Sequence, residues 1–308
     1  MWIYLGIFSA IFLGMYDVSR KHALRQNAVL PVLFLSTVFA ASFVLPLILL
    51  SRYLPELLSN SNFYVPPLSA TGHLHIFAKA VIVSASWILG YFALKNLPIS
   101  IASPIGASGL VWTLIGAVIL FHEQPTVLQY LGLGLMVASY YGFSVLGSKE
   151  GIIFYNNKWV AFIFLAALLG AASAMYDKFL IQTAGFPPIV VQVWFSIYLV
   201  PVLGLVVLLS RLAGLRRAQS SRRKKHTQFA WRWSIPAIGG FLLIADFFYF
   251  KALSYHGSLI AAISTLRASC IVVSFLVGGL LFRELQLSSK AIALAGTLAG
   301  ICLMLLSK

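Results

Sequence analysis

The sequence predicts an all-α polytopic membrane protein with ten transmembrane helices, arranged as two inverted five-helix repeats. Hydrophobic residues make up 60% of the 308 residues and charged residues only 9%, whereas ~25% of an ordinary soluble domain is charged. Apolar segments long enough to cross a bilayer follow one another along nearly the whole chain. The tripeptide Met15-Tyr16-Asp17 recurs 160 residues later, as Met175-Tyr176-Asp177. A repeat of about half the chain indicates two related halves.

Each predicted helix is an apolar run close to the ~20 residues that a membrane-spanning helix needs. The first five runs lie at residues 2–19, 29–50, 74–94, 101–121 and 125–146. The last five lie at residues 159–181, 188–210, 234–253, 258–282 and 288–306. Two polar stretches, 51–73 and 211–232, interrupt the series, and the other connections are mostly short. The helices therefore occupy most of the chain and leave no room for a soluble catalytic domain.

The polar stretch at residues 147–158 divides the chain into two predicted repeats, residues 1–146 and residues 159–308. Because five is an odd number, two homologous five-helix repeats must lie in opposite orientations in the membrane. Inverted repeats of this kind enclose a binding site near the middle of the bilayer. We therefore expect a central site between the two repeats.

Further features match between the two halves. The fourth helix of each half follows an Ala-Leu pair, ends in Phe-His-Glu or Phe-Arg-Glu, and precedes a helix with spaced glycines. In these features the chain resembles the drug/metabolite transporter superfamily and, within it, the EamA-type permeases. The resemblance covers nearly the whole chain and implies a ten-helix, five-plus-five carrier for small organic molecules, often an exporter. The chain departs from the family pattern in lacking a proline midway along each fourth helix, and in having Arg267 there.

The basic residues predict the orientation of the chain. With ten helices, 16 of the 22 Lys and Arg residues lie on the side of the 211–232 stretch, and five, Lys79 among them, lie on the other side. The positive-inside rule then places the 211–232 stretch in the cytoplasm and both termini outside the cell (inner) membrane. The resemblance implies the opposite, since family members are usually drawn with both termini inside. We expect the basic stretch to lie near lipid headgroups and not to bind nucleic acid, because no base-reading surface accompanies it.

The two Met-Tyr-Asp copies supply candidate gating or proton-coupling residues, namely Asp17, Asp177, Tyr16 and Tyr176. Each acid shares its helix face with small residues at i−3 and i−7, which lets a neighbouring helix approach closely. Each lies ~24–27 Å along its helix, near an interface, and inverted repeats predict opposite membrane faces for the two. Lys21, at i+4, is an available ion-pair partner for Asp17. A structural or gate-closing role and direct contact with substrate or protons are both compatible with this pattern.

Asp246 and Arg267 are the charged residues that we expect nearest the bilayer midplane, ~18 Å and ~14 Å into the eighth and ninth helices. A lone charge at that depth costs ~2.5–3.5 kcal/mol, so each should face protein, water or the other. The simplest interpretation is a structural ion pair between antiparallel neighbours. In the alternative, both line a cavity, where Arg267 holds an anionic group and Asp246 a cationic group or a proton. Tyr249 and Ser264 fall near them and are further substrate-binding candidates.

The first half has no ions at that depth and supplies aromatic residues instead. The substrate-binding candidates there are Trp87, Tyr91 and Trp112. A cavity that is charged on one wall and aromatic on the other suits an amphipathic metabolite such as an amino acid or a nucleoside. For each aromatic residue, helix packing or an interfacial belt is the alternative.

These features predict a secondary transporter that alternates between inward-open and outward-open states, and not an enzyme. We expect no cofactor, because the sequence has no nucleotide-binding loop, and no metal, because the histidines lack companions at ligand spacing. Proton coupling and uniport are both compatible with the sequence, as are a monomer and a homodimer. The alternatives are a lipid-handling or structural membrane subunit and, less favoured, an intramembrane aspartyl protease. The protease would need an aspartate in a Gly-x-Gly-Asp setting, which the chain lacks.

Overall fold

The computed structural model describes residues 2–139 apart from 60, 123, 125, 129, 133, 136 and 137, residues 156–218, and residues 228–306 apart from 256, 257, 259, 279, 280 and 282–286. This part of the chain is helical and contains no strand. Seven of its helices are long and apolar enough to cross a membrane. The chain is therefore a multi-pass membrane protein. The predicted count of ten is not confirmed, and the predicted helix at 125–146 and the connection at 147–158 lie in part outside the described residues.

The helices before residue 123 are α1 (Trp2–Leu24), α2 (Val29–Tyr53), α3 (Pro55–Leu58), α4 (Ala70–Asn96), α5 (Ile99–Ala107) and α6 (Gly109–Phe121). Those after residue 157 begin with α8 (Lys158–Lys178), which continues as a π-helix (Phe179–Thr183), and α9 (Pro188–Ala218). They continue with α10 (Ser234–Leu253), α11 (Ile260–Ala268), α12 (Cys270–Val273), a second π-helix (Ser274–Gly278) and α14 (Leu287–Leu306).

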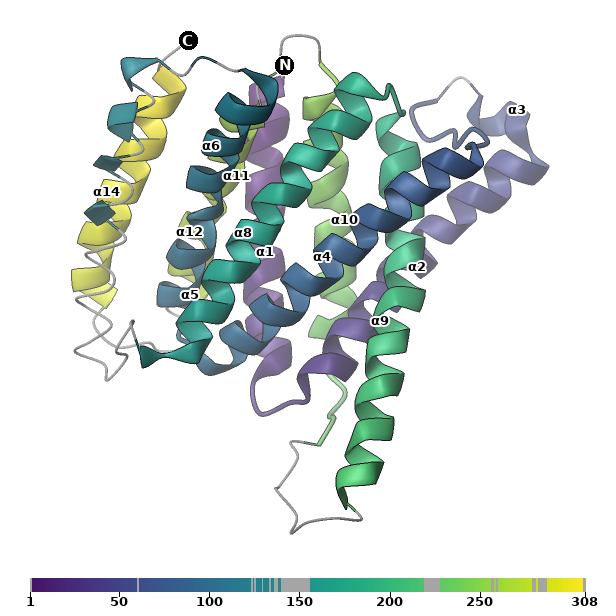
Figure 1. The fold of residues 1–308 in the computed structure, drawn as a ribbon, viewed down its shortest axis with the longest axis horizontal. Helices are drawn as coiled ribbons and strands as arrows, with labels where there is room; N and C mark the ends of the chain where they lie inside the picture. Colours follow the sequence, from purple (N-terminus) through teal and green to yellow (C-terminus); the bar gives the residue numbers. More distant parts are fainter. Residues whose placement is uncertain are drawn as a thin grey trace.

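Helices from the two parts of the chain pack against each other in a reciprocal way (Figure 1). α1 packs mainly against α10, and α4 packs mainly against α8. α2 packs against α9, while α6 contacts α8 and α11 contacts α1. In Figure 1, α1 begins and α14 ends at the same end of the bundle, opposite the end of α9 and the start of α10.

The predicted helices at 101–121 and 258–282 are each broken near their middle, at Ser108 and at Ser269. At each break the serine N–H donates to the carbonyl three residues earlier, and the serine carbonyl accepts from the N–H three residues later. These hydrogen bonds measure between 2.9 and 3.1 Å. The two breaks therefore have the same local geometry, although no proline causes either of them.

Glycine permits the closest contact of α1 with α12, as the small residues of its sequence predict. A Cβ atom on Gly14 would lie 2.4 Å from Val273 Cβ and 3.0 Å from the carbonyl oxygen of Cys270. Such distances leave no space for a side chain, so only glycine lets the two helices meet here.

Two buried apolar clusters close the bundle at different levels. One includes Ala23 and Leu24 at the end of α1, together with the end of α4 and the start of α5. The other includes Leu253 at the end of α10 and Ile260 at the start of α11, with Trp2 from the start of α1 packed against it. The first cluster reaches Tyr16 near the middle of α1, and Tyr16 also lines the candidate site.

Candidate functional site

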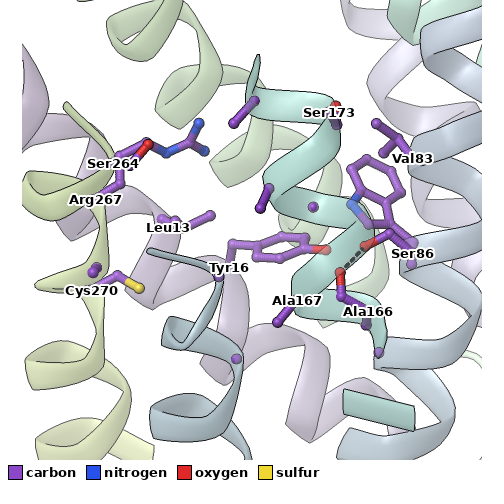
Figure 2. A pocket seen from close by; sticks show the side chains of 18 of the residues that line it. Leu13, Tyr16, Val83, Ser86, Ala166, Ala167, Ser173, Ser264, Arg267 and Cys270 are labelled. Atoms are coloured by element: carbon purple, nitrogen blue, oxygen red, sulfur yellow. Dashed lines mark hydrogen bonds between the residues drawn. The ribbon is translucent and has the colours of Figure 1, made fainter. Parts of the chain in front are cut away.

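A cavity of about 350 Å³ lies inside the bundle. Its walls come from α1, α4, α5, α6, α8, α9, α10, α11 and α12, so helices from both parts of the chain enclose it. Figure 2 shows Arg267 and Ser264 on one side, Ser173 and Ser86 on the other, and Tyr16 between them. The volume is within the ~300–1,000 Å³ typical of small-molecule sites.

Three ion pairs line this cavity. They are Asp17–Arg20 at 2.8 Å, Lys79–Asp177 at 2.5 Å and Asp246–Arg267 at 2.9 Å. All six side chains are largely withdrawn from solvent, the most exposed being Arg267 at 18%. The three acids and three bases together give this ionic lining a formal charge of zero. The cavity can therefore face both an anionic and a cationic group without a net field of either sign.

Asp246 and Arg267 are paired and also line the cavity, so the two interpretations of the sequence coincide. Arg267 Nη2 donates to Asp246 Oδ1 at 2.9 Å. The Arg267 guanidinium lies 4.2 Å from the centre of the Tyr249 ring, within the range of a cation–π contact. Ser264 lies one turn before Arg267 on α11 and lines the same wall.

Asp177 belongs to a second, deeper ion pair. It is 4% exposed, and its Oδ1 lies 2.5 Å from Lys79 Nζ. Lys79 is 3% exposed, donates to Ser173 Oγ at 3.4 Å and lies 4.4 Å from the centre of the Phe195 ring. The Tyr249 hydroxyl donates to Asp177 Oδ2 at 3.4 Å. Tyr249 thus contacts both Asp177 and Arg267 and connects two of the three ion pairs.

Lys79 lies within the predicted helix at 74–94, but it was counted only with the basic residues of one membrane side and was not predicted to line the site. The third helix begins at Ala70, four residues earlier than predicted, because the Ser69 hydroxyl caps it by accepting from Gly72 N–H at 3.1 Å. Lys79 is therefore ~14 Å into α4. The available signal was the position of Lys79 inside a predicted membrane helix, where a charged side chain should face protein or water. Arg20 was assigned to a loop because the predicted first helix ends at residue 19, whereas α1 continues to Leu24.

Asp17 pairs with Arg20, one turn away on α1, where the sequence suggested Lys21. The Arg20 guanidinium lies 5.0 Å from the Tyr16 ring centre and 5.1 Å from the Tyr91 ring centre. Lys21 Nζ instead donates to two backbone carbonyl oxygens at the end of α4, one of them 2.7 Å away. Lys21 thereby connects α1 to the C-terminal end of α4.

Asp17 and Asp177, which the inverted repeats predicted at opposite membrane faces, line the same cavity. The helices are longer than the apolar runs suggested. α1 extends to Leu24, and the π-helix carries the helix of Asp177 on to Thr183. Each acid is therefore farther from the end of its helix, and closer to the centre of the bundle, than the sequence indicated.

The aromatic candidates separate into two groups. Trp87 and Tyr16 line the cavity. Tyr91, Trp112 and Tyr176 are not among its lining residues. Tyr91 is fully buried beside Arg20, and the Trp112 ring packs edge-on against an α8 phenylalanine at 5.7 Å. For these two residues, the packing alternative describes what the structure contains.

Tyr176 contacts a histidine of α4 instead of the cavity. Its hydroxyl lies 2.8 Å from His75 Nδ1, and the neighbouring His73 forms a similar contact with Tyr198 at 2.7 Å.

Within the described residues, no group of three His, Cys, Asp or Glu side chains is close enough to hold a metal ion.

Comparisons with known proteins point to one family. The model of the EamA-like transporter family matches residues 1–145. A probable 4-amino-4-deoxy-L-arabinose-phosphoundecaprenol flippase subunit, ArnE of Salmonella typhimurium, is 31% identical over 87 residues, 27% of this chain and 76% of its own length. The ArnE of Aeromonas salmonicida is 34% identical over 62 residues, 20% of this chain and about half (54%) of its own length. A protein of known crystal structure aligns over 99% of this chain and 96% of its own, at 16% identity and a TM-score of 0.62, and shares the fold.

Proposed function

Because the chain belongs to the EamA-like transporter family, we propose that it is a secondary carrier that exports a small zwitterionic metabolite by alternating access. Family membership makes the chain a membrane transporter or flippase of the drug/metabolite transporter type. The observation that carries the finer proposal is the group of three ion pairs around one cavity of about 350 Å³. A solute with one ammonium and one acid group can exchange partners with such pairs, whereas a solute of one sign would leave an unpaired charge.

The proposed architecture is ten helices in two inverted five-helix repeats, residues 1–146 and 159–308. Three observations support it. The packing of α1 on α10 and of α4 on α8 is reciprocal. The breaks at Ser108 and Ser269 share one hydrogen-bond pattern. Asp17 and Asp177, from the two copies of the tripeptide, line one cavity. Interrupted helices at corresponding positions of two repeats are typical of transporter binding sites.

The proposed site uses both walls of the cavity. Arg267 and Lys79 bind the acid group of the substrate, and Asp246 and Asp177 bind its ammonium group. Trp87 and Tyr249 provide aromatic surface for the rest of the molecule, as an amino acid with an apolar side chain requires. Asp17 is the candidate for gating or proton coupling.

The proposed location is the inner membrane, with the 211–232 stretch in the cytoplasm and both termini outside. The charge bias supports this orientation. Arg20 and Lys79 belong to helices and not to loops, and leaving them out of the loop count does not change the sign of the bias.

A second candidate function is the flipping of a lipid-linked headgroup. It is favoured by the relatives named as flippase subunits, one of which is 31% identical to this chain over 87 residues. A lipid-linked substrate would place only its headgroup in the cavity and would leave its chains in the bilayer. Such a substrate would not be competed by water-soluble zwitterions.

The test is counterflow in proteoliposomes with a labelled mixture of amino acids, with uridine as the uncharged solute. The parent chain should exchange the amino acids, and Arg267→Ala and Asp246→Asn should each lower the rate at least ~10-fold, since a factor of ten is only ~1.4 kcal/mol. Arg52→Gln, at an exposed position at the end of α2, is the matched control and should leave the rate unchanged. Exchange of uridine alone, or of a fluorescent anionic lipid alone, would contradict the proposed substrate class.

A further inference from the structure

The Lys79–Asp177 ion pair occupies a special position in the bundle. Of the three ion pairs found in the described part of the chain, it alone joins the two proposed repeats, since Lys79 lies on α4 and Asp177 on α8. The pair between Asp17 and Arg20 lies within α1. The third pair joins α10 to α11, which both belong to the second repeat.

The seam between α4 and α8 contains polar contacts at three levels. Near one end, His75 Nδ1 lies 2.8 Å from the hydroxyl of Tyr176. Lys79 and its ion pair follow one turn further along α4. Deeper still, Ser86 donates to the carbonyl oxygen of Ala166 at 2.8 Å, as Figure 2 shows. The ion pair is the central contact of this seam, and it lines the cavity together with Ser86 and Ala166.

The corresponding seam between α1 and α10 is built differently. Ser9 donates to the Ala245 carbonyl oxygen at 2.7 Å, and the rings of Phe8 and Phe248 stack 5.5 Å apart. No ion pair joins α1 to α10 in the part of the chain that the structure describes. Of these two seams, the one between α4 and α8 therefore has the contact that a charged ligand can compete for.

The ion pair is also incompletely satisfied. Asp177 Oδ1 contacts Lys79 Nζ at 2.5 Å, and no other hydrogen bond to this buried oxygen is found in the described part of the chain. Oδ2 accepts from the Tyr249 hydroxyl at 3.4 Å, and Lys79 donates to Ser173 at 3.4 Å, both long contacts. An ammonium group has three donors and a carboxylate accepts about four hydrogen bonds, so each partner has unused capacity. A ligand that forms short hydrogen bonds with Lys79 or Asp177 therefore gains more binding free energy than it would at an ion pair exposed to water.

We propose that the Lys79–Asp177 pair is a latch between the two repeats, and that a zwitterionic substrate opens it by exchange. The ammonium group of the substrate takes Asp177, and its acid group takes Lys79. Each buried charge then keeps an opposite partner throughout, while the direct attraction between α4 and α8 is lost. Substrate binding is thereby coupled to separation of the repeats along this seam, because the ligand favours the opened state. This inference rests on the proposed function.

The test uses a cysteine that the chain already has. Cys270 lines the cavity, and Cys302, the other cysteine of the chain, is exposed on α14. In a Cys302→Ala background, the rate at which a membrane-impermeant maleimide alkylates Cys270 reports on opening of the cavity. The rate is measured in sealed vesicles of each orientation, with and without the amino-acid mixture.

In this background, the mixture should change the alkylation rate of Cys270 at least ~5-fold, the low end of coupling between two sites. Lys79→Met should give the opened-state rate without substrate, and the mixture should no longer change it. The charge-swapped variant, Lys79→Asp with Asp177→Lys, should restore the slow rate because the attraction is restored. Its counterflow rate should nevertheless stay at least ~10-fold below that of the parent, a difference of ~1.4 kcal/mol. The reason is that Arg267 still fixes the orientation in which the substrate binds. Arg52→Gln, at an exposed position at the end of α2, is the control and should change neither measurement.

Two results would overturn the latch. One is a counterflow rate of the charge-swapped variant equal to that of the parent. That result would mean that transport needs only the attraction between positions 79 and 177, and not exchange of each partner with the substrate. The other is normal counterflow by the parent with a Cys270 rate that does not respond to the mixture. If Lys79→Met does not fold, the swapped variant alone decides between these outcomes. Absence of all amino-acid counterflow in the parent would instead refute the proposed function itself.

Discussion

Replacing Arg267 by methionine separates the structural role of the Asp246–Arg267 pair from its role in transport. The variant leaves Asp246, whose side chain is 13% exposed, without its counter-ion. Breaking a buried ion pair on one side costs ~3–5 kcal/mol. The remaining exposure of both side chains places this pair near ~3 kcal/mol, because water stabilises the abandoned charge in part. Loss of the contact between the guanidinium and the Tyr249 ring adds to this cost.

A loss of ~3 kcal/mol corresponds to a melting temperature about 6 °C below that of the parent, at ~2 °C per kcal/mol for a chain of this size. Thermal unfolding in detergent, followed by the fluorescence of the seven tryptophans, measures this shift. The double variant, Arg267→Met with Asp246→Leu, is the matched control. It should melt within ~2 °C of the parent, because replacing both ions by apolar groups is close to neutral.

Counterflow then decides what the pair does. The double variant should be stable and inactive, because the cavity has lost groups that bind the substrate. A double variant that transports at the parental rate would refute the reasoning, since the pair would then serve only the fold. A single variant with an unchanged melting temperature would show that Asp246 is not held in a water-poor site.

Three further predictions follow from the described geometry. Gly14→Ala should lower the melting temperature by several degrees, because overpacking costs ~1–3 kcal/mol. Gly134→Ala should not, because the added Cβ meets no atom of the described residues within 4 Å. Trp87→Ala should lower the counterflow rate about 10-fold, since a loss of ~1.4 kcal/mol of contact energy is a factor of ten. Trp112→Phe should leave the counterflow rate unchanged. It should also preserve or raise stability, because the buried indole N–H of Trp112 has no hydrogen-bond partner among the described residues. A reporter fused to the C-terminus should be active outside the cytoplasm, and a cytoplasmic signal would contradict the orientation inferred from charge.

The sequence predicted the helical fold well because its signal is local. An apolar run of suitable length specifies a membrane helix without reference to the rest of the chain. The predicted pairing of Asp246 with Arg267 was also correct, since a short connection makes their helices neighbours. The depth of residues in the middle of helices could therefore be predicted by counting residues along one helix or along two neighbouring helices.

Errors arose where helix ends or distant packing decided the outcome. The extension of α1 to Leu24 moved Arg20 from a predicted loop into the cavity wall, and the Ser69 cap placed Lys79 deeper in its helix than predicted. The contact of Lys79 with Asp177 spans 98 positions of the chain and depends on how α4 packs on α8, which periodicity does not encode. The burial of Tyr91 likewise depends on a neighbour from another helix, Arg20.

The balance of acids and bases in the cavity wall has an electrical consequence. A membrane potential acts on any charge that crosses it with ~2.3 kcal/mol per 100 mV. A wall of three acids and three bases, carrying a solute of zero net charge, would reorient in either direction without moving charge across the field. Without a coupled proton on Asp17, the cell's resting voltage would then neither drive the loaded carrier nor hold back the empty one, and concentration gradients alone would set the direction of flux. Loss of one member, such as Lys79, would make the turnover sensitive to voltage for the first time.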